Sequence, residues 1–301
     1  MAKANIQELL DNGVHFGHLT RKWNPNMAPY IYTERNGVHI IDLYKTAAKI
    51  EEASLALQKI ANSGRKILFV ATKKQAKDIV SEKAAAVNMP FITERWPGGM
   101  LTNFITIRKA VKKMTSIDRM KQDGSFDALS KREKLQINRQ REKLDKNLGS
   151  IVDMTRLPGA IFVVDVKKEH IAIAEAQKLN IPIFAMVDTN SDPRPVDFVI
   201  PSNDDASKSI EKVLSFITEG IAEGLSDRKA EKEKAKPAEK PAEKTAEKTA
   251  EEPAAKEAVK KAAKPAKAAK AAKKEVVKEV EVVKEATPVV ETTTETTVEK
   301  K

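Results

Sequence analysis

The chain has 301 residues, of which 32% are charged, and its formal net charge at pH 7 is +11. It contains no cysteine, which excludes disulfide bonds, thiolate metal sites and thiol nucleophiles. There is no secretory signal near Met1 and no apolar run approaching the roughly 18 residues of a membrane span, so we expect a cytoplasmic protein without membrane contact.

Positive charge is concentrated in one part of the chain. Residues 1–225 contain 34 basic and 27 acidic residues, an excess of 7. Residues 101–150 alone contain 13 basic and 6 acidic residues, which is the same excess. The rest of 1–225 is therefore neutral, and 101–150 is predicted to be the electrostatic footprint for a polyanion.

Residues 13–43 are rich in basic, aromatic and amide side chains, set between glycines and prolines. They include Arg-Lys-Trp-Asn-Pro at 21–25 and Arg-Asn-Gly at 35–37. Basic side chains neutralise phosphates, aromatic rings stack on bases, and amides bond to either. The segment therefore favours nucleic-acid binding, and a folded N-terminal hairpin with core aromatics is the alternative.

Apolar strands alternate with helices on both sides of the basic segment. Thr72 and Gln75 form a capping-box pattern for the helix that follows the first strand. Because the strands are apolar throughout, they are typical of a parallel sheet covered on both faces, which is a three-layer α/β domain. The predicted strands are 66–71, 89–92, 160–164, 182–187 and 198–200, and the predicted helices are about 42–62, 72–87, 169–179 and 203–219.

The segment from Arg95 to Phe104 joins the first strand–helix units to the basic segment. Arg95 beside Trp96 suits stacking with charge, and the paired glycines at 98–99 let backbone approach another chain. A hinge loop with a buried Trp96 is the alternative. Neither Gly-x-Gly-x-x-Gly nor Gly-x-x-x-x-Gly-Lys-Ser/Thr occurs in the chain, which disfavours a nucleotide-binding enzyme.

Residues 101–150 are predicted to form two long helices that project as an antiparallel hairpin. Apolar residues recur every three or four positions from Phe104 to Ile117, and Ser130 with Glu133 forms a capping box for the second helix. The apolar stripes are narrow, as a projecting hairpin requires. Leu135, Leu144 and Leu148 form the stripe of the second helix.

The outer face of this hairpin is basic. Spacing by three and four places several cations on one side, as contact with successive phosphates requires. An ordinary solvated face is the alternative. The candidate phosphate-binding residues are Arg108, Lys109, Lys112, Lys113, Arg119, Lys131 and Arg132.

Acidic residues follow the predicted strands at their carboxyl ends, where α/β enzymes keep their catalytic groups. Together with His18, the carboxylates of Asp188, Asp204 and Asp205 could hold a divalent ion or act in acid–base catalysis. The favoured interpretation is that such residues make turns and helix caps. We therefore expect no cofactor and no catalytic residue, with a structural divalent ion or a metal-dependent α/β enzyme as the alternative.

Residues 226–301 have only alanine and valine as apolar residues, with 20 basic and 16 acidic residues. Such a segment cannot bury enough apolar surface to offset chain entropy, so disorder is predicted, with a persistent helix within 254–285 as the alternative. The expected domains are a discontinuous α/β domain at 1–100 and 151–225, a basic hairpin at 101–150, and a disordered tail at 226–301.

Several strings occur together and in order: His-Phe-Gly-His at 15–18, Arg-Lys-Trp-Asn-Pro at 21–25, Lys-Ile-Leu-Phe-Val at 66–70, Asp-Thr-Asn-Ser-Asp-Pro at 188–193 and Val-Asp-Phe-Val-Ile-Pro at 196–201. Over residues 1–225 the chain resembles the S-two family of bacterial small-subunit ribosomal proteins. The resemblance implies a flavodoxin-like (Rossmann-like) α/β domain, a protruding antiparallel coiled-coil hairpin, and no enzymatic activity.

The resemblance also implies a place in the small ribosomal subunit, at the junction of its head and body. The expected partners are small-subunit ribosomal RNA and neighbouring small-subunit proteins, including the messenger-capturing protein S-one, and no homo-oligomer is expected. The residues implied to face RNA, besides the seven on the hairpin, are Arg21, Lys22, Trp23, Asn24, Arg35, Asn36, Arg95, Trp96 and Asn103.

Overall fold

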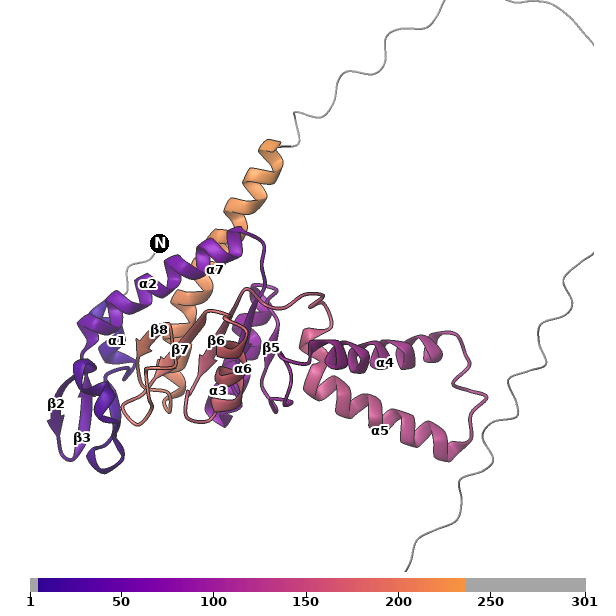
Figure 1. Ribbon diagram of the computed structural model, residues 1–301, viewed down its shortest axis with the longest axis horizontal. Helices are drawn as coiled ribbons and strands as arrows, with labels where there is room; N and C mark the ends of the chain where they lie inside the picture. Colours follow the sequence, from indigo (N-terminus) through magenta and orange to yellow (C-terminus); the bar gives the residue numbers. More distant parts are fainter. Residues whose placement is uncertain (1–4, 236–301) are drawn as a thin grey trace, which may run out of the picture. The chain divides into compact units, whose positions relative to one another are not determined.

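The computed structural model describes residues 5–235, and their centre is a parallel sheet of five strands (Figure 1). The strands lie in the order β5-β4-β6-β7-β8, which is 2-1-3-4-5 in chain order. This is the order of flavodoxin-like sheets, so the predicted parallel α/β fold is confirmed. The bounds are β4 (Ile67–Val70), β5 (Phe91–Ile92), β6 (Ala160–Val164), β7 (Ile183–Val187) and β8 (Phe198–Pro201).

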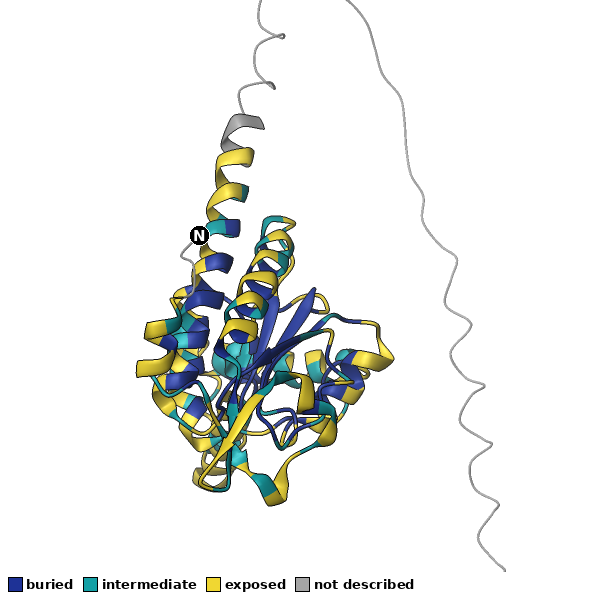
Figure 2. Cartoon of the chain, turned by 90° about the vertical axis from the view of Figure 1, so that its left-hand side faces the viewer, coloured by how far each residue is buried: buried dark blue, intermediate teal, exposed yellow. Residues whose placement is uncertain are grey.

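Helices cover both faces of this sheet. In Figure 2 the strands are coloured as buried, and the helices carry exposed residues (yellow) on their outer sides. Phe69 and Phe162 belong to one core cluster with residues of α2, α3 and α7. Their neighbours Val70 and Val163 point to the other face and cluster with α6 and the base of the hairpin. No helix in residues 5–235 is long and apolar enough to cross a membrane. The bounds are α1 (Ile6–Asp11), α2 (Leu43–Asn62), α3 (Lys74–Ala86), α6 (His170–Lys178) and α7 (Ser207–Ala235).

Helix α3 begins differently from the prediction. The predicted capping box of Thr72 and Gln75 is wrong, because Lys73 stands at the N-cap and no side chain caps the helix. The main-chain N–H of Thr72 donates to the Glu169 carboxylate at 2.8 Å, and its hydroxyl donates to the same oxygen. An ionised acceptor forms stronger hydrogen bonds than a neutral one, so the distant carboxylate takes both donors.

Helix α7 is longer than the predicted 203–219 and includes residues 226–235, which the sequence predicts to be part of the disordered tail. Its contacts with α2 explain the extension. Gly220 and Gly224 lie against Ser54 and Gln58 with no room for a Cβ, and the amide of Gln58 donates to Asp227 at 3.3 Å. The rest of the predicted tail, residues 236–301, lies outside the described residues.

Residues 16–41 form a second sheet, which is antiparallel and has the order β1-β3-β2. Asn36 and Gly37 connect β2 to β3 with φ angles of 54° and 73°, as a type I′ turn requires. The segment lies beside the carboxyl ends of β7 and β8, where the N–H of Asn203 donates to the carbonyl of Val14 at 3.1 Å. The bounds are β1 (Phe16–Leu19), β2 (Ile31–Arg35) and β3 (Val38–Ile41), with 3-10 helices at Thr20–Lys22 and Pro25–Tyr30.

Helices α4 (Phe104–Gln122) and α5 (Lys131–Leu148) pack together and extend away from the sheet (Figure 1). The capping box of Ser130 and Glu133 is present, as predicted. Leu135 departs from the predicted stripe, since 52% of its surface is exposed near the tip. Both helices lie within the predicted insertion at 101–150, and the division into domains stays a prediction.

Replacing Gly224 by valine should lower the free energy of unfolding by about 2–3 kcal/mol, because a Cβ there overlaps the backbone carbonyl of Gln58. Ala222→Val adds the same side chain to the exposed face of the same helix, and should cost only about 0.5 kcal/mol in helix propensity. Urea unfolding of both variants measures the difference. Equal losses would show that the α2–α7 approach is not tight.

Candidate nucleic-acid interface

The N-terminal segment presents cations and one aromatic ring to solvent. Arg21 and Lys22 are exposed in a 3-10 helix, and Trp23 is 39% exposed with its ring centroid 5.2 Å from that of His39. Asn24 has a structural role, because its Oδ1 accepts from the N–H of Asn26 at 2.9 Å and caps the next turn. The predicted cations and aromatic are therefore brought together on one surface.

Thr189 anchors this segment to the sheet. Its hydroxyl accepts from the N–H of His18 at 2.8 Å, and its carbonyl accepts from the N–H of Asn24 at 2.8 Å. A Cβ on Gly17 would come within 2.6 Å of the Thr189 methyl, so β1 lies directly on the loop after β7. Thr189 thus determines where the exposed residues 21–23 lie.

Two further predicted residues lie on the β2–β3 hairpin. Arg35 and Asn36 are both exposed, and Tyr32 on the same edge strand is 76% exposed. Asn36 also supplies the left-handed conformation that the turn requires. These positions extend the exposed N-terminal surface.

The seven predicted cations of the α4–α5 hairpin are all exposed, and none forms an ion pair within residues 5–235. Three other cations of the hairpin have carboxylate partners, one of them Lys146, which lies 3.5 Å from Glu94. Arg141 donates to Asp118 at 2.5 Å, and Lys134 lies 3.6 Å from Asp127. The hairpin therefore holds uncompensated positive charge that faces solvent.

Trp96 does not face a ligand, which corrects the expectation. It is 7% exposed, and its indole N–H donates to Glu175 in α6 at 3.0 Å. The alternative that Trp96 is buried is therefore correct, and a hinge at this loop stays a prediction. Its neighbours in the prediction, Arg95 and Asn103, are exposed at the base of the hairpin.

The structure separates the predicted residues into two surfaces. The hairpin follows β5 at one edge of the sheet, whereas the N-terminal sheet contacts the loops after β7 and β8 towards the other edge (Figure 1). At the base of the hairpin a cavity of about 130 Å³ is lined by Phe104, Ile107, Arg108 and Met154, among others. A single RNA contact could not cover both surfaces without crossing the domain between them.

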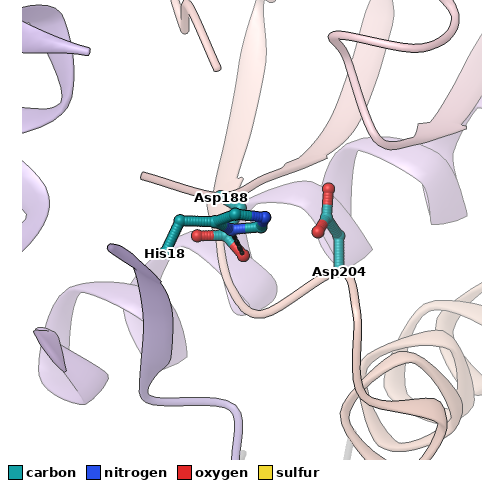
Figure 3. A group of neighbouring side chains, drawn as sticks. All are labelled: His18, Asp188 and Asp204. Atoms are coloured by element: carbon teal, nitrogen blue, oxygen red, sulfur yellow. Dashed lines mark ion pairs between the residues drawn. The ribbon is translucent and has the colours of Figure 1, made fainter. Parts of the chain in front are cut away.

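His18, Asp188 and Asp204 converge at the carboxyl ends of β7 and β8 (Figure 3). One ring nitrogen of His18 lies 2.9 Å from Asp188 Oδ2, and the other lies 3.2 Å from Asp205. Lys73 donates to Asp204 at 2.8 Å and lies 2.5 Å from Asp205. The His18–Asp188 contact is an ion pair without hydrogen-bond geometry, since Asp188 Oδ2 has no hydrogen-bond partner in residues 5–235.

Two acidic or imidazole groups of this cluster, Asp204 and His18, have raised pKa values, whereas burial would raise the pKa of Asp205 but the hydrogen bond and charge of Lys73 lower it. Burial raises the pKa of Asp204 from 3.8 to about 7, the charges of Asp188 and Asp165 add to the shift, and Lys73 opposes it. The contact with Asp188 raises the pKa of His18 above 6.5, while burial lowers it and the neighbouring carboxylates raise it further. The cluster therefore retains protons at neutral pH that the unfolded chain would release.

Three residues on which this arrangement depends were not among the predicted site residues, namely Lys73, Thr189 and Glu175. Lys73 follows the first predicted strand, and its position at a strand's carboxyl end could have indicated a role in the acidic cluster. Thr189 stood inside the quoted string at 188–193. Glu175 had no local signal, because its partners lie at 96–102.

Stability should fall as pH rises from about 4 to above 7, so far as this cluster determines it. The pKa of Asp204 is raised on folding, so its contribution is complete below 3.8 and is lost as pH passes about 7. That of His18 is lost as pH passes its raised pKa. Asp204→Asn should therefore flatten the dependence of unfolding free energy on pH.

Urea unfolding between pH 5 and 8 (roughly the range of these two groups), with chelator in every buffer, measures this slope. Asp123→Asn, an exposed substitution near the hairpin tip, should keep the wild-type slope. A slope that is unchanged in Asp204→Asn would contradict the assignment.

Comparison with known proteins agrees with the α/β fold. The family described as Ribosomal protein S2 matches residues 9–224. A protein of Flavobacterium johnsoniae named small ribosomal subunit protein uS2 is 77% identical over 216 residues, which cover 72% of this chain and 85% of that protein. Its namesake in Parabacteroides distasonis is 67% identical over 219 residues, covering 73% and 79%. The chain belongs to the ribosomal protein S2 family.

Proposed function

We propose that this protein is a structural constituent of the small ribosomal subunit, cytoplasmic and ribosome-bound, that binds small-subunit ribosomal RNA at the junction of head and body. We also propose that it helps to recruit the messenger-capturing protein S-one. Family membership supports the structural role. The head–body location and the recruitment of S-one rest on the family resemblance.

The exposed cations of the hairpin are the observation that supports RNA binding most strongly. Arg108, Lys112 and Arg119 are exposed along α4, and Lys131 and Arg132 begin α5. None of them has a carboxylate partner in the described part of the chain, whereas the partly buried cations Lys73 and Arg141 do. Phosphate groups would supply the missing negative charge, and the counterions released would add to the affinity.

The N-terminal surface supports a second contact of a different kind. The rings of Trp23 and Tyr32 are exposed in the same N-terminal segment as the exposed Arg21, Lys22 and Arg35. Exposed aromatics stack on unpaired bases, so this surface suits a single-stranded or looped part of the RNA. A protein with separate contacts at the two edges of its sheet can join two parts of one RNA.

We propose that α4 and α5 form an antiparallel coiled coil. Met114 and Ile117, which lie in the part of α4 beyond its first two turns, are each only 5% exposed. Helix α5 packs against α4. Leu144 and Leu148 of α5 pack in the cluster at its base. Paired helices with one narrow apolar seam are stiff enough to hold the basic faces towards a ligand.

The loops at the sheet's switch point support a role without catalysis, in agreement with relatives that are ribosomal proteins and not enzymes. In flavodoxin-like sheets a ligand binds between the loops after the first and third strands. Here these loops hold each other, because Thr72 after β4 donates to Glu169 after β6 and Lys168 donates to the Thr72 carbonyl at 3.0 Å. A ligand would have to break these bonds.

A structural divalent ion is the second candidate at the acidic cluster. The Oδ2 atoms of Asp188 and Asp204 are buried and accept no hydrogen bond within residues 5–235. With His18 they offer one nitrogen and two oxygens, a set that zinc accepts. If an ion binds, zinc should raise the melting temperature of the chelator-treated protein, and His18→Ala should abolish the increase. An unchanged melting temperature with zinc would exclude a zinc ion at this cluster.

Charge reversal of the hairpin tests the main proposal. Lys112→Glu, Lys113→Glu and Arg119→Glu together should weaken binding to small-subunit ribosomal RNA and lower the slope of log affinity against log salt by about three. The matched control reverses three exposed lysines of the α/β domain, Lys59, Lys74 and Lys178, with the same change in net charge. This control variant should keep most of the wild-type slope of log RNA affinity against log salt.

Small subunits that lack this protein test the recruitment of S-one, because the wild-type chain can be added back to them or left out. Subunits assembled with the wild-type chain should retain S-one, and subunits without the chain should lose it, as sedimentation and gel analysis would show. Equal RNA binding by both triple variants would refute the hairpin assignment. Equal S-one content with and without the chain would refute the recruitment.

A further inference from the structure

Glu175, in the middle of α6, accepts five hydrogen bonds from one short segment of chain. Its Oε1 accepts from the Trp96 indole at 3.0 Å and from the Gly99 N–H at 2.8 Å. Its Oε2 accepts from the N–H groups of Leu101 at 2.9 Å and Thr102 at 3.1 Å, and from the Thr102 hydroxyl at 3.2 Å. All these donors lie between β5 and the start of α4.

The carboxylate is held as an anion without any cation. Glu175 is 9% exposed and forms no ion pair within the described residues. Burial alone would raise its pKa, but the hydrogen bonds from Trp96, Leu101, Thr102 and Gly99 outweigh burial and lower it. Convergent N–H groups of this kind also hold phosphates in proteins. Here a side chain of the protein fills the nest.

The geometry of the 96–102 segment depends on this anion. Gly99 has a φ of +81°, a conformation that a side chain disfavours, and its carbonyl accepts from the N–H of Asn103 at 2.8 Å. Met100 and Leu101 are buried beneath the loop. The chain then enters α4 at Phe104, so the direction of the helix is determined where the loop is fixed.

We propose that Glu175 is a positioning residue that fixes the direction in which the α4–α5 hairpin leaves the α/β domain. The other end of the hairpin is held independently, because Leu148 is buried and the Ser150 hydroxyl donates to the carbonyl of Phe91 in β5. Glu175 thus holds the first leg, and the sheet edge holds the second. The consequence for RNA affinity rests on the proposed function of the hairpin; the positioning does not.

Glu175→Gln tests the proposal with little change in size. The amide group has only one oxygen, and its NH₂ faces donors, so at least two N–H groups lose their acceptor. The apolar packing of Met100 and Leu101 is unchanged by this substitution. A loss of direction without a loss of the core is therefore the expected result.

The hairpin direction can be measured in the free protein by electron spin resonance. Because the chain has no cysteine, spin labels on Ser125→Cys at the hairpin tip and Glu82→Cys on α3 are unique. The distance distribution between the labels should broaden in Glu175→Gln. Trp96→Phe removes a single donor, folds with the carboxylate still bound by backbone, and should broaden it less.

Glu169→Gln is the matched control. Glu169 is also a buried carboxylate next to α6, 3% exposed, but it accepts from Thr72 and forms no hydrogen bond or ion pair with the hairpin. It should lower stability and leave the distance distribution as in the wild type. An unchanged distribution in Glu175→Gln, or equal broadening in Glu169→Gln, would overturn the proposal.

RNA binding supplies the separate readout for function. Glu175→Gln should weaken binding to small-subunit RNA about tenfold, because a freely directed hairpin lowers the effective concentration of the second contact. Its salt slope should stay near that of the wild type, since every cation is still present. If the label distances broaden and affinity is unchanged, the positioning stands and the RNA role of the hairpin fails.

Discussion

The ion pair between Lys73 and Asp204, at 2.8 Å, is the interaction on which the arrangement of the loops around the sheet depends. Buried carboxylates are costly without a cation or donors, and Asp188 and Asp204 are each 1% exposed. Lys73 and His18 supply this charge from segments far apart in the chain. The N-terminal sheet must therefore dock on the ends of β7 and β8, and this docking determines which of its residues remain in solvent.

Buried and exposed charges are separated by position in the fold. Inside the α/β domain the buried carboxylates have partners within the fold, as Glu169 has Thr72 and Glu175 has the loop at 96–102. On the hairpin the cations outnumber their carboxylate partners, and the excess faces solvent. A neutral domain with a cationic arm can fold without its ligand and still attract a polyanion at long range.

The predictions from sequence succeeded where the signal is local and failed where it is not. The predicted strands at 160–164 and 182–187 and the predicted helix at about 42–62 follow from apolar runs, and the structure has them as β6, β7 and α2, with β7 beginning one residue later. Thr72 and Trp96 were misassigned because each donates a hydrogen bond to a carboxylate far along the chain. The acceptor is 97 residues away for Thr72 and 79 residues away for Trp96. The end of α7 depends on its packing against α2, which no propensity scale contains.

Because the hairpin is long, a small change of direction at its base displaces its tip by a large distance. Helix α4 has 19 residues and is therefore about 28 Å long at 1.5 Å per residue. A tilt of roughly 10° at Trp96 would move the far end by about 5 Å, which is of the order of the distance between successive phosphates of a nucleic-acid strand. The lever thus gains or loses one phosphate register through a rotation that a single lost hydrogen bond could permit, which gives the buried nest at 96–102 its mechanical importance.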